Sequence, residues 1–339
     1  MTYVIINPQV DRPKSASELG NDDPMLKIVD EDTTGVTVRG AKMLGTSSIM
    51  ANKVFVAHLQ PLCPDEVDYA ICFAMSMATE ELKVLSRKSY EQHAVSDFDN
   101  PLSTRYDEND TMMFLDDVKV PWHRIVVYRD PDMCRRQFHD TPGYIYQNYW
   151  AQNRLMVKLK FLVGLAREVC ETIGTVKLPP VADALGKMAA QAAAVENMMW
   201  GMEAKGSQWG KYFVPDRHAV YAAQTLTQEY YPMMINTLRE LAGGALIMLP
   251  SSTEDLDHPE LAAIAESVQV SADGRSAEDR IKMMKLVWDA VGSEFAGRHT
   301  QYEMFYTVAQ FVTRGHSFRT YDWEKSAALI RTITDRYGR

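Results

Sequence analysis

The stretch Arg124-Ile125-Val126-Val127-Tyr128 is the last of a series of short β-type runs, and the pattern of the 339-residue chain changes just after it. Upstream, short apolar runs alternate with turn residues, which is typical of strands. Downstream, from Gly143 onward, apolar residues recur at helical spacing, and the first such stripe is Leu155, Leu159, Leu162, Val163 and Ala166. The sequence therefore predicts a β module followed by a helical bundle.

The β module is predicted to hold several strands. They are residues 26–29, 35–38, 53–57, 69–74, 112–115 and 124–128. Turn residues such as Gly40, Pro61 and Asp99-Asn100-Pro101 separate them. Because helical spacing does not fit these windows, we expect a compact, mostly antiparallel barrel or sandwich.

The helical region is predicted to be a bundle of about four long helices. After the first stripe, Ala184, Met188, Ala192, Val195 and Met199 form a second one, and further helical stretches lie near residues 216–246 and 276–308. Methionines fill irregular gaps, so Met188, Met198, Met199 and Met202 are interpreted as core or subunit interface. The acidic segment 251–279 is expected to be an exposed connection. The predicted domains are residues 1–130 and 131–339.

Composition limits the classes of partner. The formal net charge is −9, the isoelectric point is near 5.4, and no run of Lys or Arg occurs. Phosphate binding needs clustered cations, so neither nucleic acid nor an anionic membrane surface is expected as a partner. The chain shows no secretory leader and no uninterrupted apolar stretch of about 18 residues, which favours a soluble cytoplasmic protein.

Motifs of common catalytic sites are missing from the sequence. There is no GxGxxG after a strand, no Walker loop, no HExxH and no GxSxG elbow. Cys63, Cys72, Cys134 and Cys170 are scattered without CxxC spacing, and no histidine pairs with them at metal spacing. We therefore expect free thiols in a reducing cytoplasm and no metal site.

Several longer segments resemble one family of flavin enzymes, the oxygenase component of 4-hydroxyphenylacetate 3-monooxygenase. The first two are Ile5-Ile6-Asn7-Pro8-Gln9-Val10-Asp11-Arg12 and Pro101-Leu102-Ser103-Thr104-Arg105-Tyr106-Asp107-Glu108-Asn109-Asp110. Further matches are Gly40-Ala41-Lys42-Met43-Leu44-Gly45-Thr46, Asp117-Val118-Lys119-Val120-Pro121-Trp122, Arg154-Leu155-Met156-Val157-Lys158-Leu159 and Phe295-Ala296-Gly297-Arg298-His299. They follow the family's order along nearly the whole chain.

This resemblance implies an α+β fold similar to that of acyl-CoA dehydrogenases. In the family an N-terminal helical domain precedes the β domain, and the C-terminal bundle forms a homotetramer. The first residues here enter an apolar run directly, so the N-terminal helical domain is expected to be absent from this sequence.

The resemblance also implies flavin-contacting residues. Gln9, Val10, Asp11 and Arg12 match the family's flavin segment at the start of the β module, and Thr46 matches a hydroxyl placed on the flavin. An amide can reach polar ring atoms and an arginine can fork onto a phosphate. A strand entry with a solvated arginine, and a threonine kept for β-propensity, remain the alternatives.

A second set of flavin contacts is implied near the C-terminus. Gln310, Phe311, Val312 and Thr313 fall on a flavin-contacting loop of the family, although their residue types depart from its usual pattern. No catalytic residue is assigned. Tyr3 occupies the place of a family histidine that contacts the substrate hydroxyl, and an ordinary tyrosine is a poor base near neutral pH.

The implied activity is that of an aromatic hydroxylase. A separate flavin reductase supplies reduced FAD, which reacts with molecular oxygen to a C4a-hydroperoxide and hydroxylates a phenol ortho to its hydroxyl group. Two alternatives stay open. One is a non-catalytic or truncated relative that serves as a structural or binding subunit, and the other is an enzyme similar to 4-hydroxybutyryl-CoA dehydratase.

Overall fold

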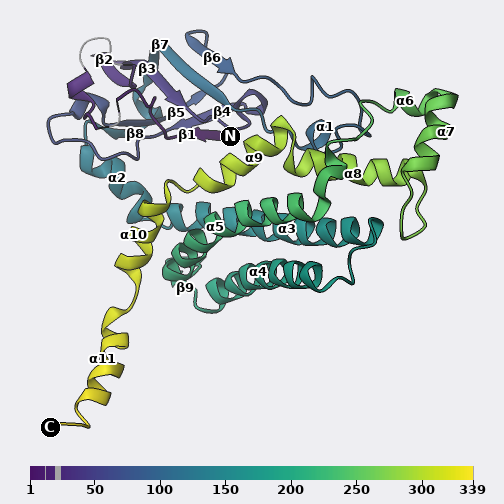
Figure 1. Ribbon diagram of the computed structural model, residues 1–339. Helices are drawn as coiled ribbons and strands as arrows, with labels where there is room; N and C mark the ends of the chain where they lie inside the picture. Colours follow the sequence, from purple (N-terminus) through teal and green to yellow (C-terminus); the bar gives the residue numbers. More distant parts are fainter. Residues whose placement is uncertain (12, 20–23, 339) are drawn as a thin grey trace. The chain divides into compact units, whose positions relative to one another are not determined.

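The computed structural model describes residues 1–11, 13–19 and 24–338, which form two compact units (Figure 1). The first unit holds Met1–His93 and Tyr106–Tyr144, and the second holds Ala94–Arg105 and Ile145–Arg339. Segment 94–105 therefore lies in sequence between the two ranges of the first unit but belongs to the second unit.

The first unit contains two four-stranded sheets. One has the order β1 (Thr2–Val4), β4 (Lys53–Val56), β5 (Ile71–Ser76) and β8 (Ile125–Tyr128), and the other β2 (Lys27–Asp32), β3 (Gly35–Met43), β7 (Thr111–Pro121) and β6 (Leu82–Ser86). All pairs are antiparallel except β1 with β4. Short helical turns lie at Ser17–Leu19, Ser48–Met50, Val67–Tyr69 and Trp122–Arg124, and α2 (Pro131–His139) follows the last strand.

The two sheets share one apolar core. Val54, Val56 and Phe73 come from the first sheet, and Val36 and Leu115 from the second, and all are buried. Each sheet keeps two edge strands, so neither closes into a barrel within the described ranges, and the barrel expectation is wrong. All the predicted strand windows overlap observed strands, whereas β1 and β6 were not predicted.

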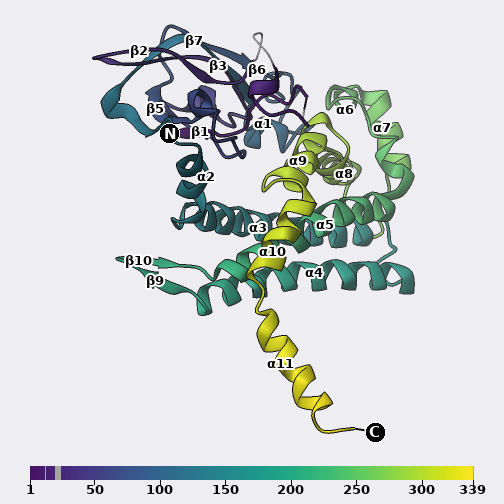
Figure 2. The same cartoon turned by 90° about the vertical axis from the view of Figure 1, so that its left-hand side faces the viewer.

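The second unit is helical. Its long helices are α3 (Gly143–Thr172), whose first two residues lie in the first unit, α4 (Pro179–Ala204), α5 (Arg217–Ala242) and α8 (Ala277–Val291). They bury a common core, and α3, α4 and α5 lie side by side in both views (Figures 1 and 2). The methionine stripe joins the buried interior, with Met188, Met199 and Met202 at most 5% exposed. The predicted bundle is confirmed.

Shorter elements complete the second unit. They are α1 (Ser103–Tyr106), whose last residue lies in the first unit, the hairpin β9 (Ser207–Trp209) and β10 (Tyr212–Val214), a turn at Gly243–Leu246, α6 (Glu254–Asp257), α7 (Pro259–Val268), α9 (Glu294–Phe305), α10 (Gln310–Thr320) and α11 (Trp323–Thr334). The Ser293 side chain caps α9 by accepting from Ala296 N, so the predicted stretch 276–308 is broken into two helices. Segment 251–279 is largely exposed, as expected, but it also carries α6 and α7, which were not predicted. Among the described residues, no helix has the length and apolar character needed to cross a membrane.

Two buried aspartates, Asp289 on α8 and Asp99 in the segment, hold segment 94–105 against α8. Asp289 on α8 accepts hydrogen bonds from Leu102 N and Ser103 N, both at 2.8 Å, and from Ser103 Oγ at 2.6 Å. Lys285, one turn earlier, pairs with Asp99 at 2.8 Å. A buried carboxylate with three donors fixes the path of this segment.

We predict that Asp289→Ala lowers the free energy of unfolding by about 3 kcal/mol, because it leaves two backbone amides, of which that of Ser103 is buried and that of Leu102 half-buried, and a hydroxyl without their acceptor. Urea denaturation measures the loss. Glu266→Ala on the exposed side of α7 is the control and should change stability by less than about 0.5 kcal/mol. Equal stability of both variants would contradict the assigned role of Asp289.

Candidate functional site

The turn that follows β3 carries Thr46. Two of its residues, Leu44 and Ser47, have positive φ angles of 65° and 58°. Residues other than glycine seldom adopt this left-handed conformation, and it persists only where the surrounding structure imposes it. Thr46 lies between two such residues, so its turn is a held conformation, meaning one that the surrounding structure fixes.

The neighbouring β7 strand imposes this conformation. Gly45 N donates to Thr111 O at 2.9 Å, and Ser47 N donates to Asn109 O at 2.8 Å. A Cβ on Gly45 would lie 2.6 Å from Thr111 Oγ1, so any larger residue would force side chains of the strand to shift. Ser48 Oγ and Thr111 Oγ1 add a buried contact of 2.5 Å.

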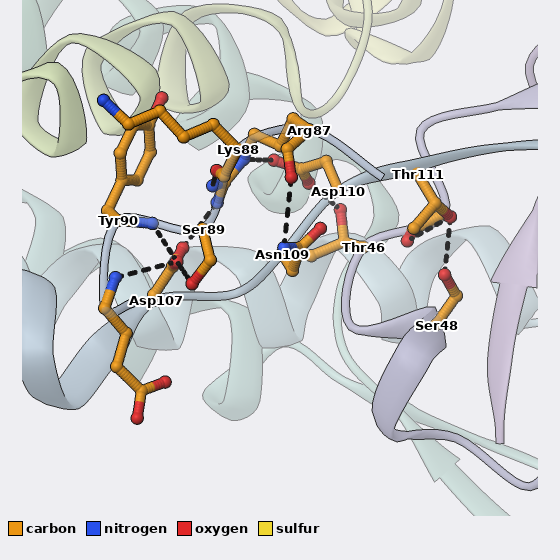
Figure 3. A network of polar contacts seen from close by, with 12 residues as sticks. Thr46, Ser48, Arg87, Lys88, Ser89, Tyr90, Asp107, Asn109, Asp110 and Thr111 are labelled. Carbon is orange, nitrogen blue, oxygen red and sulfur yellow. Dashed lines mark hydrogen bonds and ion pairs between the residues drawn. The ribbon is translucent and has the colours of Figure 1, made fainter. Parts of the chain in front are cut away.

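An ion-pair network orients the Thr46 hydroxyl (Figure 3). Thr46 Oγ1 donates to Asp110 Oδ1 at 2.8 Å, and Asp110 pairs with Arg87 Nε at 3.0 Å. Arg87 also pairs with Asp107 at 2.5 Å, and Asp107 accepts from the backbone N–H of Tyr90. Burial opposes ionisation of Asp107, but the bonds from Arg87 and Tyr90 outweigh it and hold its pKa below the usual range.

This arrangement decides what Thr46 can offer to a ligand. Its proton is committed to Asp110, so the oxygen is left to accept a hydrogen bond from an N–H or O–H group. Beside the network lies an open pocket of about 520 Å³. Its lining is Ile49, Met50, Ser86, Arg87, Lys88, Ser89, Glu91, Gln92, His93, Asp107 and Asn109.

The N-terminal segment runs beside this turn. Thr2 Oγ1 donates to Thr46 O at 2.9 Å, and Met43 N donates to Ile6 O at 2.9 Å. The structure thus sets residues 2–6, which precede the predicted flavin contacts, beside the stretch 43–46 that ends in Thr46.

The members of that predicted segment lie at the surface. Gln9 and Val10 are exposed, and Asp11 forms an ion pair with Lys14 at 2.9 Å. Arg12 lies outside the described residues.

The sequence reasoning missed the group that anchors this segment. Lys42 is 1% exposed, and its Nζ donates to Asn7 Oδ1 at 2.6 Å, two residues before Gln9. Burial lowers the pKa of Lys42 to about 8. Burial and the nearby Lys42 charge lower the pKa of His58 to about 3, so this buried imidazole is neutral. A lysine within an apolar strand sequence was the available signal.

In the second unit, two stretches that carried the family resemblance meet. Arg154 and Lys158 on α3 pair with Glu303 on α9 at 2.9 and 2.7 Å, and Lys158 Nζ lies 3.0 Å from His299 Nδ1. Burial raises the pKa of Glu303, but the charges of Lys158 and Arg154 outweigh it and lower the pKa overall. No group of three or more His, Cys, Asp or Glu side chains that could hold a metal was found in the part of the chain that the structure describes.

The predicted C-terminal flavin residues begin α10 of this unit. Phe311 is 77% exposed, whereas Thr313 is buried and its hydroxyl donates to Gln228 Oε1 at 2.8 Å. Gln228 Nε2 also donates to Val308 O at 2.7 Å, and Val308 has a φ of 116°. A β-branched residue in that region is strained, so this turn is also a held conformation. Gln310 and Val312 are half-buried.

We predict that Arg87→Met lowers the free energy of unfolding by about 3 kcal/mol or more, because two largely buried carboxylates lose their cation. Chemical denaturation measures it. The matched control is Arg105→Met, which breaks an exposed pair with Asp97 and should cost less than about 1 kcal/mol. Similar losses in both variants would contradict a buried network.

We also predict that Lys42 makes stability rise with pH. Because its folded pKa of about 8 lies below the ordinary 10.5, the unfolded state holds more protons between these values. The free energy of unfolding should therefore rise by up to about 3 kcal/mol from pH 8 to 10.5. Lys42→Met should lack this rise. Denaturant titrations at pH 7.5 and 10 compare the two proteins, and parallel pH profiles would contradict the prediction.

Comparison with known proteins gives the same family over both units. The model described as 4-hydroxyphenylacetate 3-hydroxylase N terminal matches residues 1–127, and its C-terminal counterpart matches residues 134–335. A 4-hydroxyphenylacetate 3-monooxygenase oxygenase component of Pseudomonas aeruginosa is 33% identical over 330 residues, 94% of this chain and 62% of its own. The oxygenase component of 4-nitrophenol 2-monooxygenase from a Rhodococcus species is 33% identical, with 90% and 59% covered.

A solved structure agrees with these matches. It is the oxygenase component of 4-hydroxyphenylacetate 3-monooxygenase complexed with FAD and 4-hydroxyphenylacetate, and it superposes with a TM-score of 0.91 at 27% identity. The match covers 99% of this chain and 70% of that one. The chain therefore spans a little under two thirds of the curated relatives and has the acyl-CoA dehydrogenase-like fold of this group. By sequence and by fold, it belongs to the family of 4-hydroxyphenylacetate 3-monooxygenase oxygenase components.

Proposed function

We propose that this chain acts in the oxygenase component of a two-component monooxygenase that binds reduced FAD and hydroxylates a phenol ortho to its hydroxyl group. The observation that carries the proposal is the held turn 44–47, which presents the oriented Thr46 oxygen beside the N-terminal segment. Family membership supplies the chemistry, since relatives are named as monooxygenase components and one is solved with FAD.

The first unit offers groups that fit a flavin. Val10 and Leu44 are 59% and 56% exposed, and such apolar surface suits one face of an aromatic ring system. The Thr46 oxygen can accept from a ring N–H, and the exposed Gln9 amide can meet a ring carbonyl or a ribityl hydroxyl. We propose Gln9, Val10, Asp11, Arg12 and Thr46 as one set of contacts and Gln310, Phe311, Val312 and Thr313 as a second.

Bound FAD would supply the oxidising chemistry, as a C4a-hydroperoxide formed with molecular oxygen, after a separate reductase has reduced it. The task of this chain is to hold the ring and exclude water. Lys42 holds Asn7, and the network of Arg87, Asp107 and Asp110 holds the Thr46 hydroxyl, so both contact segments are fixed before the ligand arrives. Such preorganisation lowers the entropic cost of binding.

The substrate is proposed only as a class. The relatives are named for 4-hydroxyphenylacetate and 4-nitrophenol, which share a phenolic hydroxyl and differ in the group opposite it. Tyr3 can hydrogen-bond such a hydroxyl as donor or acceptor.

The test is anaerobic titration of the protein with photoreduced FAD, followed by mixing with oxygenated buffer and recording near-ultraviolet absorbance. We expect binding, a transient flavin–oxygen intermediate, and faster decay of that intermediate with one phenol than with others. Failure to bind reduced FAD would overturn the proposal and favour the structural or binding subunit.

Thr46→Val tests the contact itself, because it removes the hydroxyl while keeping the side-chain shape. We predict a several-fold weaker affinity for reduced FAD with a stability loss of about 1 kcal/mol from the broken Asp110 bond. Thr332→Val on the exposed face of α11 is the control and should bind like the unaltered protein. Unchanged affinity in Thr46→Val would remove Thr46 from the site.

A further inference from the structure

Two buried cysteines of the first unit are in contact. Cys72 on β5 and Cys134 on α2 are 0% and 1% exposed, and their Sγ atoms lie 3.8 Å apart. A disulfide needs about 2.0 Å, so these are two thiols that touch without being bonded. The proposed flavin chemistry uses neither of them.

The surroundings of the two sulfur atoms differ. Cys72 Sγ accepts a hydrogen bond from Gln137 Nε2 at 3.0 Å. The contact with the Cys134 thiol lowers the pKa of Cys72, and burial opposes it. Hydrogen bonds from the Gln137 amide and the His58 backbone and the charge of Lys42 lower that pKa further. The same contact with Cys72, together with burial, raises the pKa of Cys134. The hydrogen bond from Gln137 thus favours a thiolate on Cys72, with Cys134 as the thiol partner beside it.

The cysteine pair also connects to the predicted flavin segment. Lys42 lies close enough for its charge to favour the Cys72 thiolate, and the same ammonium donates to Asn7 Oδ1 at 2.6 Å. A charge on Cys72 thus stabilises the charged form of the group that holds Asn7. Charged donors make the stronger hydrogen bonds.

We propose that Cys72 and Cys134 are a peroxide-sensitive pair that closes reversibly to a disulfide. The Cys72 thiolate attacks one oxygen of hydrogen peroxide, the O–O bond breaks, and the products are a sulfenic acid and hydroxide, which takes a proton to become water. The Cys134 sulfur then attacks the Cys72 sulfur, the S–O bond breaks, and a second water leaves. Two thiols lose two electrons in total, and one peroxide gains them.

The source of the peroxide rests on the proposed function, because reduced flavin that reacts with oxygen without a substrate releases hydrogen peroxide. Closure removes the negative charge beside Lys42. A buried ammonium without that partner loses its proton more readily, so its bond to Asn7 weakens. Oxidation of the pair would thus loosen the flavin segment when turnover runs without substrate.

The test treats the fully reduced, folded protein with hydrogen peroxide and maps its peptides without reduction. We expect a linked pair of peptides containing Cys72 and Cys134, a mass lower by two hydrogens, and reversal by dithiothreitol. In Cys134→Ser the reaction should stop at a Cys72 sulfenic acid that dimedone traps, and Cys72→Ser should give neither product.

The control is Cys63→Ser, which removes the exposed cysteine and should behave like the unaltered protein. Absence of the linked peptide in the folded protein, or a link that requires Cys63, would overturn the proposal. Flavin plays no part in this readout, so failure to bind FAD would leave the result on the cysteines intact.

The coupling to the flavin segment is measured separately. Peroxide treatment should weaken the affinity of the unaltered protein and of Cys63→Ser for reduced FAD several-fold, and dithiothreitol should restore it. Cys134→Ser cannot form the disulfide, so peptide mapping of the treated variant should show no link that dithiothreitol reverses. Equal affinities before and after closure in the unaltered protein would overturn the proposed link through Lys42.

Discussion

The pairing of β3 with β7 is the constraint on which the first unit depends. The two strands are in register from Gly35 opposite Pro121 to Met43 opposite Met112, with one irregularity between Val38 and Gly40. At Gly40 the φ angle is 124°, and a Cβ there would lie 2.3 Å from Met25 O, so the kink requires glycine. The ladder carries the chain to a fixed end point, where the turn with Thr46 begins.

Beyond this end point, buried polar groups take over from the sheet. Gly45 and Ser47 bond to the backbone of residues 109–111, and the carboxylates around Arg87 lock the same region from the other side. A buried polar group without a partner costs more than its bond contributes, so such a network is stable only when all its members are satisfied. Rigid presentation of the Thr46 oxygen follows from that condition.

Lys42 links the proposed site to the inferred redox pair. It lies on β3 with its side chain buried; its Nζ donates to Asn7 Oδ1, and its charge acts on Cys72. An isolated buried ammonium is costly, and a nearby thiolate reduces that cost. The same electrostatic term therefore bears on the flavin segment and on the reactivity of Cys72.

The sequence by itself determined the strand windows, the helical stripes and the family. These follow from local periodicity and from motifs that occur in a fixed order along the chain. It placed Thr46 on a stretch that the structure sets beside residues 2–6, which precede the predicted flavin residues Gln9, Val10 and Asp11. It did not give β1, the open edges of the sheets, the breaks around Ser293 or the helices within 251–279. It also missed the meeting of Lys42 with Asn7 and of Cys72 with Cys134, which are 35 and 62 residues apart. Only the tertiary structure decided these, because the partner of a buried charge or thiol is set by packing between distant segments, and no local pattern records it.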